Sequence, residues 1–170
     1  MKLTSEQYSR QAEELAPFLI GKLLCRKLPS GDIIKLRITE TECYCGERDT
    51  ACHAHKGRTP RTETLYRQGG TVYVYLCYGI HNLMNVISGS EGEAQGVLLR
   101  AVEGTYGPGR LTKLLEIDRR LNGADLASSD EIWIEDDGVD FEYELGTRIG
   151  INYASNEDKN RLWRFTAKNL

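Results

Sequence analysis

The chain has 170 residues, which is enough for one domain with a proper hydrophobic core, and its composition is that of an ordinary globular protein. No apolar run approaches about 18 residues, and no basic stretch followed by an apolar one opens the chain, which excludes a membrane span and a secretory signal. We therefore expect a single domain over residues 1–170, with the cytoplasm as the default compartment.

The charge is unevenly spread along the sequence. The net charge of −3 argues weakly against a nucleic-acid partner, but residues 125–144 contain many acids and no lysine or arginine, so the rest of the chain is net positive. Basic residues gather in three groups, near residues 56–67, 110–120 and 159–168. Such asymmetry is typical of a protein that faces a polyanion with one side. The alternative is that these are ordinary solvated surface charges.

The first part of the chain predicts a helix, two strands and a long connection. Residues 4–15 have capping residues at their start and apolar positions at helical spacing, and Pro17 breaks or tightens the chain after them. Residues 23–28 and 33–44 have the pattern of strands, joined by a Pro-Ser-Gly-Asp turn. Residues 45–70 are a long basic connection, and a connection of this length is usually functional.

Residues 71–88 predict a β-hairpin that carries several tyrosines. Its first half, T-V-Y-V-Y-L-C-Y, is dense in β-branched and aromatic residues, and Gly79 then interrupts the strand pattern. Tyr78 lies near the tip, where small or polar residues are usual. Aromatic side chains in this position favour a partner with flat faces, such as a nucleobase. The alternative is that the tyrosines pack on the sheet with their hydroxyls in water.

The second part of the chain predicts further strands and one helix. Residues 96–102 form an almost continuous apolar strand, interrupted only by Arg100, and residues 110–121 have a helical pattern. A short strand at 132–135, an acidic loop and a closing strand at 162–166 follow. Strands outnumber helices, and most connections are too short for helical crossovers. We therefore expect an α+β domain around a curved, mainly antiparallel sheet.

Three cysteines and two histidines cluster in the long connection and the strand before it, at Cys43, Cys45, Cys52, His53 and His55. Cysteine and histidine are the natural ligands of zinc, but C-x-C and H-x-H are not the spacings of the usual structural sites. The odd total of five cysteines, without a signal peptide, favours reduced thiols. We expect neither a metal nor a cofactor, and a small zinc-dependent protein stays as an alternative.

Glu42 and Arg100 are charged residues in segments that are otherwise typical of buried strands. Strand alternation predicts one face that carries Ile38, Glu40, Glu42 and Tyr44. This face is then partly buried, with a carboxylate beside an aromatic ring, and such burial raises a carboxylate's pKa and makes it a stronger base. Arg100 needs a partner, which a carboxylate from a neighbouring strand would provide. The alternatives are solvated glutamates and a purely structural ion pair.

Motifs of several other enzyme classes are absent. The chain has no G-x-x-x-x-G-K-[ST] phosphate loop, no G-x-G-x-x-G after a strand and no G-x-S-x-G elbow. No nucleophile–base pair stands out either. Hydrolysis by an activated water is therefore the most economical reaction.

Six motifs, in order along the chain, resemble those of the alkyladenine (3-methyladenine, methylpurine) DNA glycosylase family. They are R-I-T-E-T-E-C-Y, T-P-R, T-V-Y-V-Y-L-C-Y-G-I-H-N-L-M-N, G-V-L-L-R-A-V-E, G-P-G-R-L and R-I-G-I, and the similarity runs from about residue 15 to residue 168. The resemblance implies a single mixed α/β domain with a curved antiparallel sheet, flanking helices and a protruding hairpin.

The resemblance also implies a function. The expected activity is that of a monofunctional base-excision-repair glycosylase, without lyase activity, which flips out alkylated or deaminated purines and hydrolyses the N-glycosidic bond. The expected substrates are 3-methyladenine and 7-methylguanine, with hypoxanthine as a further candidate. The expected partner is damaged double-stranded DNA, bound by a monomer with no membrane involved. The expected location is then the nucleoid in a bacterium or the nucleus in a eukaryote. A catalytically idle binder of damaged DNA is the alternative.

Seven residues match the family's site. Glu42 matches the general base that activates the attacking water, and Arg100 matches the arginine that helps to hold this water and the adjacent phosphate. Tyr78 matches the tyrosine that intercalates where the flipped nucleotide has left the stack. The remaining four match the pocket for the flipped base: Tyr44 and His53 on one wall, Tyr75 on the opposite stacking face, and Asn85 at the purine edge.

Overall fold

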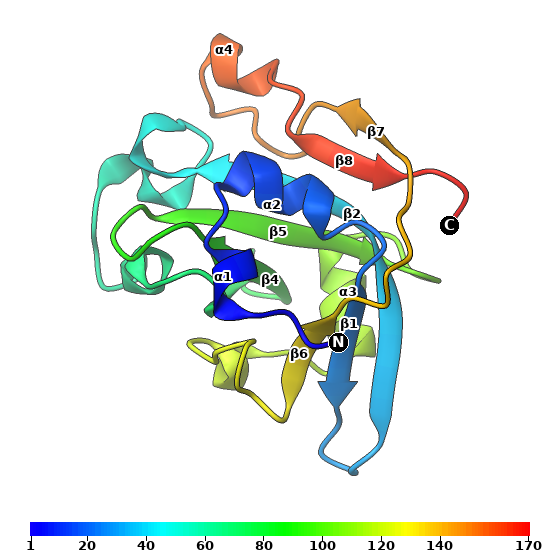
Figure 1. Ribbon diagram of the computed structural model, residues 1–170. Coiled ribbons are helices and arrows are strands. Elements are labelled where there is room, and N and C mark those ends of the chain that lie inside the picture. Colours follow the sequence, from blue (N-terminus) through cyan, green and yellow to red (C-terminus); the bar gives the residue numbers. More distant parts are fainter.

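One long strand, β2 (Ile33–Cys45), organises the sheet of this protein. The computed structural model describes residues 1–170 and contains one eight-stranded antiparallel sheet, in the order β3-β4-β5-β2-β1-β6, with β8 beside β2 and β7 beside β8 (Figure 1). The other strands are β1 (Leu23–Lys27), β3 (Val72–Cys77), β4 (His81–Ser88), β5 (Gln95–Val102), β6 (Ile132–Glu135), β7 (Tyr143–Gly146) and β8 (Arg164–Ala167).

Short helices connect and cover the strands. The α-helices are α1 (Ser5–Tyr8), α2 (Ala12–Phe18), α3 (Pro108–Leu114) and α4 (Asn156–Lys159). The 3₁₀-helices are η1 (Gly46–Arg48), η2 (His53–Lys56), η3 (Glu63–Tyr66) and η4 (Arg119–Leu121). None of these helices is long and apolar enough to cross a membrane.

β2 changes partner along its length, and this bends the sheet. On one edge it pairs with β1 through residues 33–37 and with β8 through residues 40–42, while β5 lies on its other edge from Ile38 onward. The register between β2 and β5 shifts between Ile38 and Thr41. Irregularities of this kind bend a strand and increase its twist. The curved, antiparallel sheet that the sequence predicts is therefore confirmed.

The main core lies on the face of the sheet that α2 covers (Figure 1). It includes Leu15 from α2, and Val97 and Leu99 from β5. Side chains alternate along a strand. The residue between Val97 and Leu99, and the residues next to them on either side, therefore point to the other face of the sheet. A smaller cluster on that other face includes Tyr66 and Tyr73 and packs under the long connection between β2 and β3.

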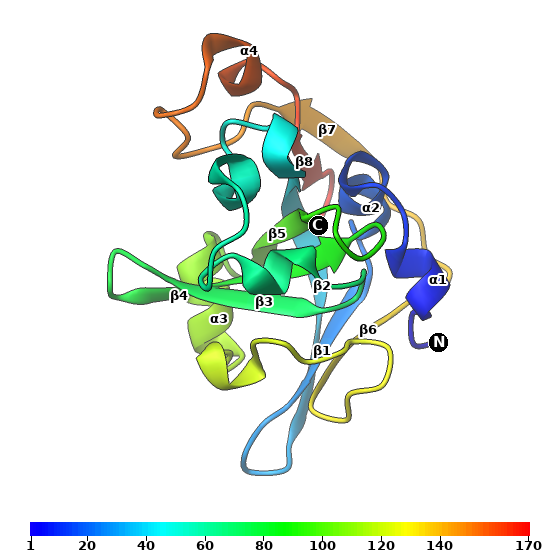
Figure 2. The ribbon, with the colours of Figure 1, turned by 90° about the vertical axis from the view of Figure 1, so that its left-hand side faces the viewer.

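β3 and β4 form the predicted hairpin, which projects from the body of the protein (Figure 2). Tyr78 and Gly79 both have left-handed backbone angles, with φ of 52° and 67°, and the Ile80 N–H donates to the Cys77 carbonyl at 3.1 Å. This hydrogen bond closes a tight turn, and three residues separate the paired Cys77 and His81. A left-handed tyrosine is less favourable than a glycine by about 1–2 kcal/mol. The tip therefore presents a 90% exposed aromatic side chain on a strained backbone.

The helix predicted over residues 4–15 is two helices instead. The Gly89 N–H donates to the carbonyls of Tyr8 and Arg10 at 3.2 and 2.9 Å, and these carbonyls are thereby withdrawn from a continuous helix. The break that the sequence predicts from Pro17 onward is confirmed, because α2 ends at Phe18, although Pro17 itself still lies inside the helix. Only one intrahelical hydrogen bond is lost so close to a helix end.

The helix predicted over residues 110–121 ends early, and several short elements, among them two in the C-terminal part of the chain, were not predicted. α3 stops at Leu114, Glu116 has a left-handed φ of 47°, and Asp118 caps the separate η4 by accepting from the Arg120 N–H. The two further elements are β7, in the predicted acidic loop, and α4. The side chains of β7 are nearly all exposed, so the strand has no buried alternation and depends on backbone pairing with β8.

Candidate functional site

A cleft of about 710 Å³ lies between the hairpin and the C-terminal part of the chain, lined by 26 residues. Neighbouring strands β2 to β5 each contribute to it, and because their side chains alternate, the cleft opens on the sheet face opposite the main core. The structure brings six of the seven predicted site residues into its lining: Tyr44, His53, Tyr75, Tyr78, Asn85 and Arg100.

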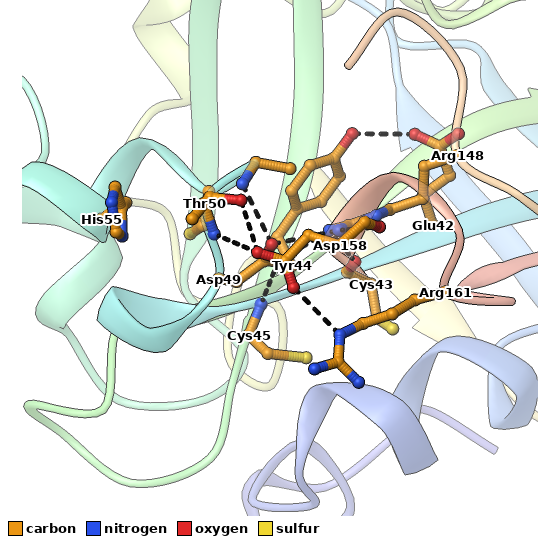
Figure 3. A network of polar contacts seen from close by, with 12 residues as sticks. Glu42, Cys43, Tyr44, Cys45, Asp49, Thr50, His55, Arg148, Asp158 and Arg161 are labelled. Atoms are coloured by element: carbon orange, nitrogen blue, oxygen red, sulfur yellow. Dashed lines mark hydrogen bonds and ion pairs between the residues drawn. The ribbon is translucent and has the colours of Figure 1, made fainter. Parts of the chain in front are cut away.

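Glu42 is the seventh predicted residue, and it lies behind the lining. Its side chain is 0% exposed. The Tyr44 hydroxyl donates to Glu42 Oε1 at 2.9 Å, and the Ile149 N–H donates to Oε2 at 2.7 Å. Figure 3 shows the Tyr44 ring with its hydroxyl pointing at this carboxylate. Arg100 Nη1 lies 3.7 Å from Oε1, so Arg100 connects the carboxylate to the cleft.

The pKa of Glu42 is raised above the ordinary value of a glutamate. Burial is the largest cause, because it disfavours the charged form. Arg100, the Ile149 N–H and the Tyr44 hydroxyl act in the opposite direction and favour the carboxylate. The pKa of Tyr44 is itself raised by burial and by Glu42, so its hydroxyl stays protonated and remains a donor. The site thus holds a carboxylate that binds a proton more readily than a solvated one.

The predicted face of β2 is partly wrong. Ile38 does not share a face with Glu42, because Ile38 packs in the main core together with Cys43 and Cys45. Tyr44 packs instead against the smaller cluster on the cleft side. The register shift between Ile38 and Thr41 is the physical reason, since it reverses the alternation in the middle of the strand.

Aromatic rings form one wall of the cleft. The ring centroids of His53 and Tyr75 lie 4.6 Å apart, and those of Tyr73 and Tyr75 lie 5.4 Å apart. His53 Nδ1 is 3.2 Å from the Tyr73 hydroxyl. Burial, and then the nearby positive charge of Arg61, lowers the pKa of His53, so its imidazole is neutral near pH 7. A neutral imidazole offers one donor and one acceptor.

Asn85 lies at the floor of the cleft, on β4 opposite Tyr73. It is buried, and its Nδ2 donates to the Tyr73 carbonyl at 3.3 Å. This hydrogen bond fixes the orientation of the amide and leaves its oxygen free for a partner in the cleft. A side chain held in this way can test the hydrogen-bonding edge of a flat ligand.

Arg100 has the carboxylate partner that its burial predicts, and it has two of them. Arg100 Nε lies 3.3 Å from Glu40 Oε1, and Nη1 lies 3.7 Å from Glu42 Oε1. Both carboxylates come from β2, the strand next to β5. Glu40 also lies 3.3 Å from Arg164 Nη1 on β8.

The sequence pattern does not single out Asp49 and Arg148, which the structure joins in a fully buried ion pair at 2.7 Å (Figure 3). Both guanidinium ends of Arg148 donate to Asp49, and Nη1 also donates to the Cys43 carbonyl at 3.0 Å. The guanidinium lies 4.9 Å from the Tyr44 ring centroid. Because Ile149 follows directly, this pair fixes the backbone N–H that holds Glu42. The one available signal was a lone arginine in R-I-G-I after a long segment without basic residues.

The cysteine and histidine cluster does not form a metal site. Cys43 and Cys45 face the main core, whereas Cys52 belongs to the cluster on the cleft side. His55 is exposed, and its Nδ1 lies 2.9 Å from the Glu47 carbonyl oxygen. No three histidine, cysteine, aspartate or glutamate side chains are arranged so that they could hold a metal ion.

Comparisons with known proteins point to one family. The family model for Methylpurine-DNA glycosylase (MPG) matches residues 6–106 and 103–170. A protein of Psychrobacter cryohalolentis is 44% identical, over 86% of this chain and 83% of its own. A protein of Borreliella afzelii is 40% identical over 93% and 91%, and one of Methanocella arvoryzae is 41% identical over 98% and 92%. The name of each of the three contains the words 3-methyladenine DNA glycosylase.

Arg148→Met leaves the Asp49 carboxylate buried without a partner, and we expect it to lower the free energy of unfolding by about 3–5 kcal/mol. Urea denaturation measures this change. The matched control is Arg120→Met, which breaks an exposed ion pair with Asp118 and should change the unfolding midpoint little. Equal midpoints for the two variants would contradict a central role of the buried pair.

Proposed function

Because the chain belongs to the methylpurine-DNA glycosylase family, we propose that it removes alkylated or deaminated purines from double-stranded DNA by hydrolysing the N-glycosidic bond. 3-Methyladenine and 7-methylguanine are the proposed substrates, with hypoxanthine as a further candidate. The observation that carries the mechanism is the buried Glu42 carboxylate beside Arg100, at the base of an aromatic cleft. The proposed acting form is a monomer.

Glu42 is the proposed general base. Each carboxylate oxygen can accept more than one hydrogen bond, and Tyr44 and Ile149 take one on each, so the carboxylate can also accept from a water held by Arg100. The water oxygen bonds to C1′ of the sugar, Glu42 takes the water proton, and the bond from C1′ to the base nitrogen breaks with its electron pair leaving on the base. The negative charge of Glu42 also stabilises an oxocarbenium-like transition state.

The aromatic wall is the proposed binding site for the flipped base. The His53 and Tyr75 rings lie together, with their centroids 4.6 Å apart, rather than on opposite walls as the resemblance implies, and Tyr44 also lines the cleft. A cationic base such as 3-methyladenine gains from such rings both by stacking and by cation–π attraction. Asn85, whose amide is held by the Tyr73 carbonyl, then contacts the purine edge.

The lining of the cleft supports a monofunctional enzyme. Glycosylases with lyase activity need an amine that forms a Schiff base with the sugar. None of the 26 lining residues is a lysine. Water activated by Glu42 is then the nucleophile that the site can provide.

Tyr78 is the proposed wedge. It sits at the tip of the projecting hairpin, borders the cleft and is 90% exposed. Removing a base from the stack costs a few kcal/mol, and an inserted aromatic ring recovers part of this. The tight turn, closed by the hydrogen bond from the Ile80 N–H to the Cys77 carbonyl, fixes the position from which the ring would enter the duplex.

We expect Glu42→Gln to lower the rate of 3-methyladenine release by about 10²–10⁴-fold. The substituted amide can still accept from the Ile149 N–H and donate to the Tyr44 hydroxyl, so the site should keep its shape. Single-turnover release of free base from a methylated duplex measures the rate. If Glu42→Gln released base at the wild-type rate, Glu42 would be excluded as the base. If the wild-type protein bound damaged DNA but never released a base, it would be a damage binder and no enzyme.

Tyr44→Phe removes a hydrogen bond that favours the Glu42 carboxylate, so the pKa of Glu42 should rise further. Release needs the ionised form, and we therefore expect the acid limb of the pH–rate profile to move to higher pH. The matched control is Tyr66→Phe, which loses a hydroxyl bonded to a different carboxylate, Glu47, at 2.7 Å. A profile that moves equally in both variants would argue against this role of Tyr44.

Tyr78→Ala should weaken binding to a duplex that carries an abasic-site analogue by about 1–3 kcal/mol, the contribution of one stacked aromatic ring. Fluorescence anisotropy with labelled duplex measures the affinity. Tyr143→Ala, which removes another exposed tyrosine from β7, is the control and should leave the affinity unchanged. Equal affinities for the wild type and Tyr78→Ala would show that Tyr78 is not the wedge.

A further inference from the structure

We propose that Glu40 is a positioning residue, which holds the Arg100 guanidinium away from the Glu42 carboxylate and in place for the attacking water. This inference rests on the function proposed above, in which Glu42 is the base and Arg100 holds the water. Nothing in the sequence pattern separates Glu40 from Glu42, because both lie in the same strand two residues apart.

Arg100 lies within ion-pair distance of two carboxylates, those of Glu40 and Glu42. Its Nε lies 3.3 Å from Glu40 Oε1, whereas its Nη1 lies 3.7 Å from Glu42 Oε1. The side chains of Arg100 and Glu40 are only 13% and 15% exposed, so solvent ions screen their attraction little. The guanidinium is therefore held between the two carboxylates and closer to Glu40.

The contact with Glu40 leaves Arg100 incompletely bonded. Arg100 Nε is buried and makes no hydrogen bond of good geometry, although Glu40 is within ion-pair distance. If the charge of Glu40 is removed, the nearest remaining carboxylate is that of Glu42. Arginine and carboxylate groups favour close, two-pronged pairing. We therefore expect Arg100 to close the 3.7 Å gap and pair directly with Glu42.

This movement would damage the site in two ways. A carboxylate that is paired directly with arginine is a weaker base, because the cation favours its charged form. The guanidinium donors that face the cleft would also turn away from the water. Glu40 itself does not line the cleft, so its loss should leave DNA binding unchanged.

The charged and polar groups around Glu42 come from every element packed against it. Burial raises the pKa of Glu42, whereas Arg100 on β5, the Ile149 N–H, the Tyr44 hydroxyl and Arg148 lower it. Glu40 on β2 shares Arg100 with Glu42 and also pairs with Arg164 on β8. Tyr75 and Tyr153 are the other titratable groups that interact with the Glu42 carboxylate.

The test is Glu40→Gln, which removes the charge and keeps the size. We expect kcat for 3-methyladenine release to fall roughly tenfold, a part of what a general base contributes. The acid limb of the pH–rate profile should move to lower pH, because the closer Arg100 lowers the pKa of Glu42. The affinity for an abasic-site duplex should not change.

Two further variants separate positioning from a structural role. Glu135→Gln is the matched control, since it removes a partly buried carboxylate from β6 and breaks its 2.8 Å ion pair with Lys35, far from the cleft. Its kcat and pH profile should equal those of the wild type. In an Arg100→Gln background, Glu40→Gln should have no further effect on kcat, because the effects of substitutions at interacting residues are not additive.

Three results would overturn the inference. They are a wild-type kcat and acid limb in Glu40→Gln, a wild-type kcat in Arg100→Gln, and an undiminished effect of Glu40→Gln in the Arg100→Gln background. The outcome with Glu42→Gln distinguishes the two proposals. If Glu42→Gln is inactive while Glu40→Gln behaves as the wild type, only the role of Glu40 is wrong, whereas an active Glu42→Gln variant contradicts the proposed function itself.

Discussion

The buried ion pair between Asp49 and Arg148 is the contact on which the site depends. It joins the connection after β2 to the loop before α4, two segments almost a hundred residues apart. Asp49 also accepts from the backbone N–H groups of Cys45 and Ala51 at 2.9 and 3.0 Å, so the pair orders the backbone on its own side as well. A buried pair of this kind adds little net stability compared with apolar packing, but its two-pronged geometry fixes positions closely. Its consequence is that Ile149 presents its N–H to Glu42.

Two opposing influences set the pKa of Glu42: burial raises it, and its hydrogen-bond and charge partners lower it. Burial alone would keep the carboxyl group neutral at physiological pH, and strong pairing with an arginine alone would make it a poor base. The structure combines burial with one backbone donor, one tyrosine hydroxyl and an arginine that stays at 3.7 Å. The raised pKa is the net result. In the proposed mechanism, Arg100 holds the water at the cleft lining, and the carboxylate behind the lining accepts the proton of this water.

The acidic segment of the chain and the arginines of the cleft lie on different sides of the molecule. The acidic segment from β6 to β7 lies on the side away from the hairpin tip (Figure 2). Arg61 and Arg110 line the cleft itself, on the side of the hairpin. This separation agrees with the uneven charge of the sequence, and the exposed Tyr78 borders the same cleft as these arginines.

The sequence by itself determined the strands and the residue types of the site. β-Branched and aromatic patterns located β1, β2, the hairpin, β5 and β6, because local propensity and burial agree there. The ordered motifs identified the family, and six of seven predicted site residues line the cleft. Strand patterns and motifs show which residue types the strands and the site require, and they can be recognised without the long-range contacts.

Only the tertiary structure decided how these residues meet. The register shift in β2 separates Ile38 from Glu42, and strand alternation could not predict it because it arises from pairing with β5. β7 has no buried face and exists through its partner β8. Asp49 and Arg148 lie far apart in sequence, and each alone resembles a surface charge. Their burial, and with it the placement of Glu42, depends on contacts that form only when the chain has folded.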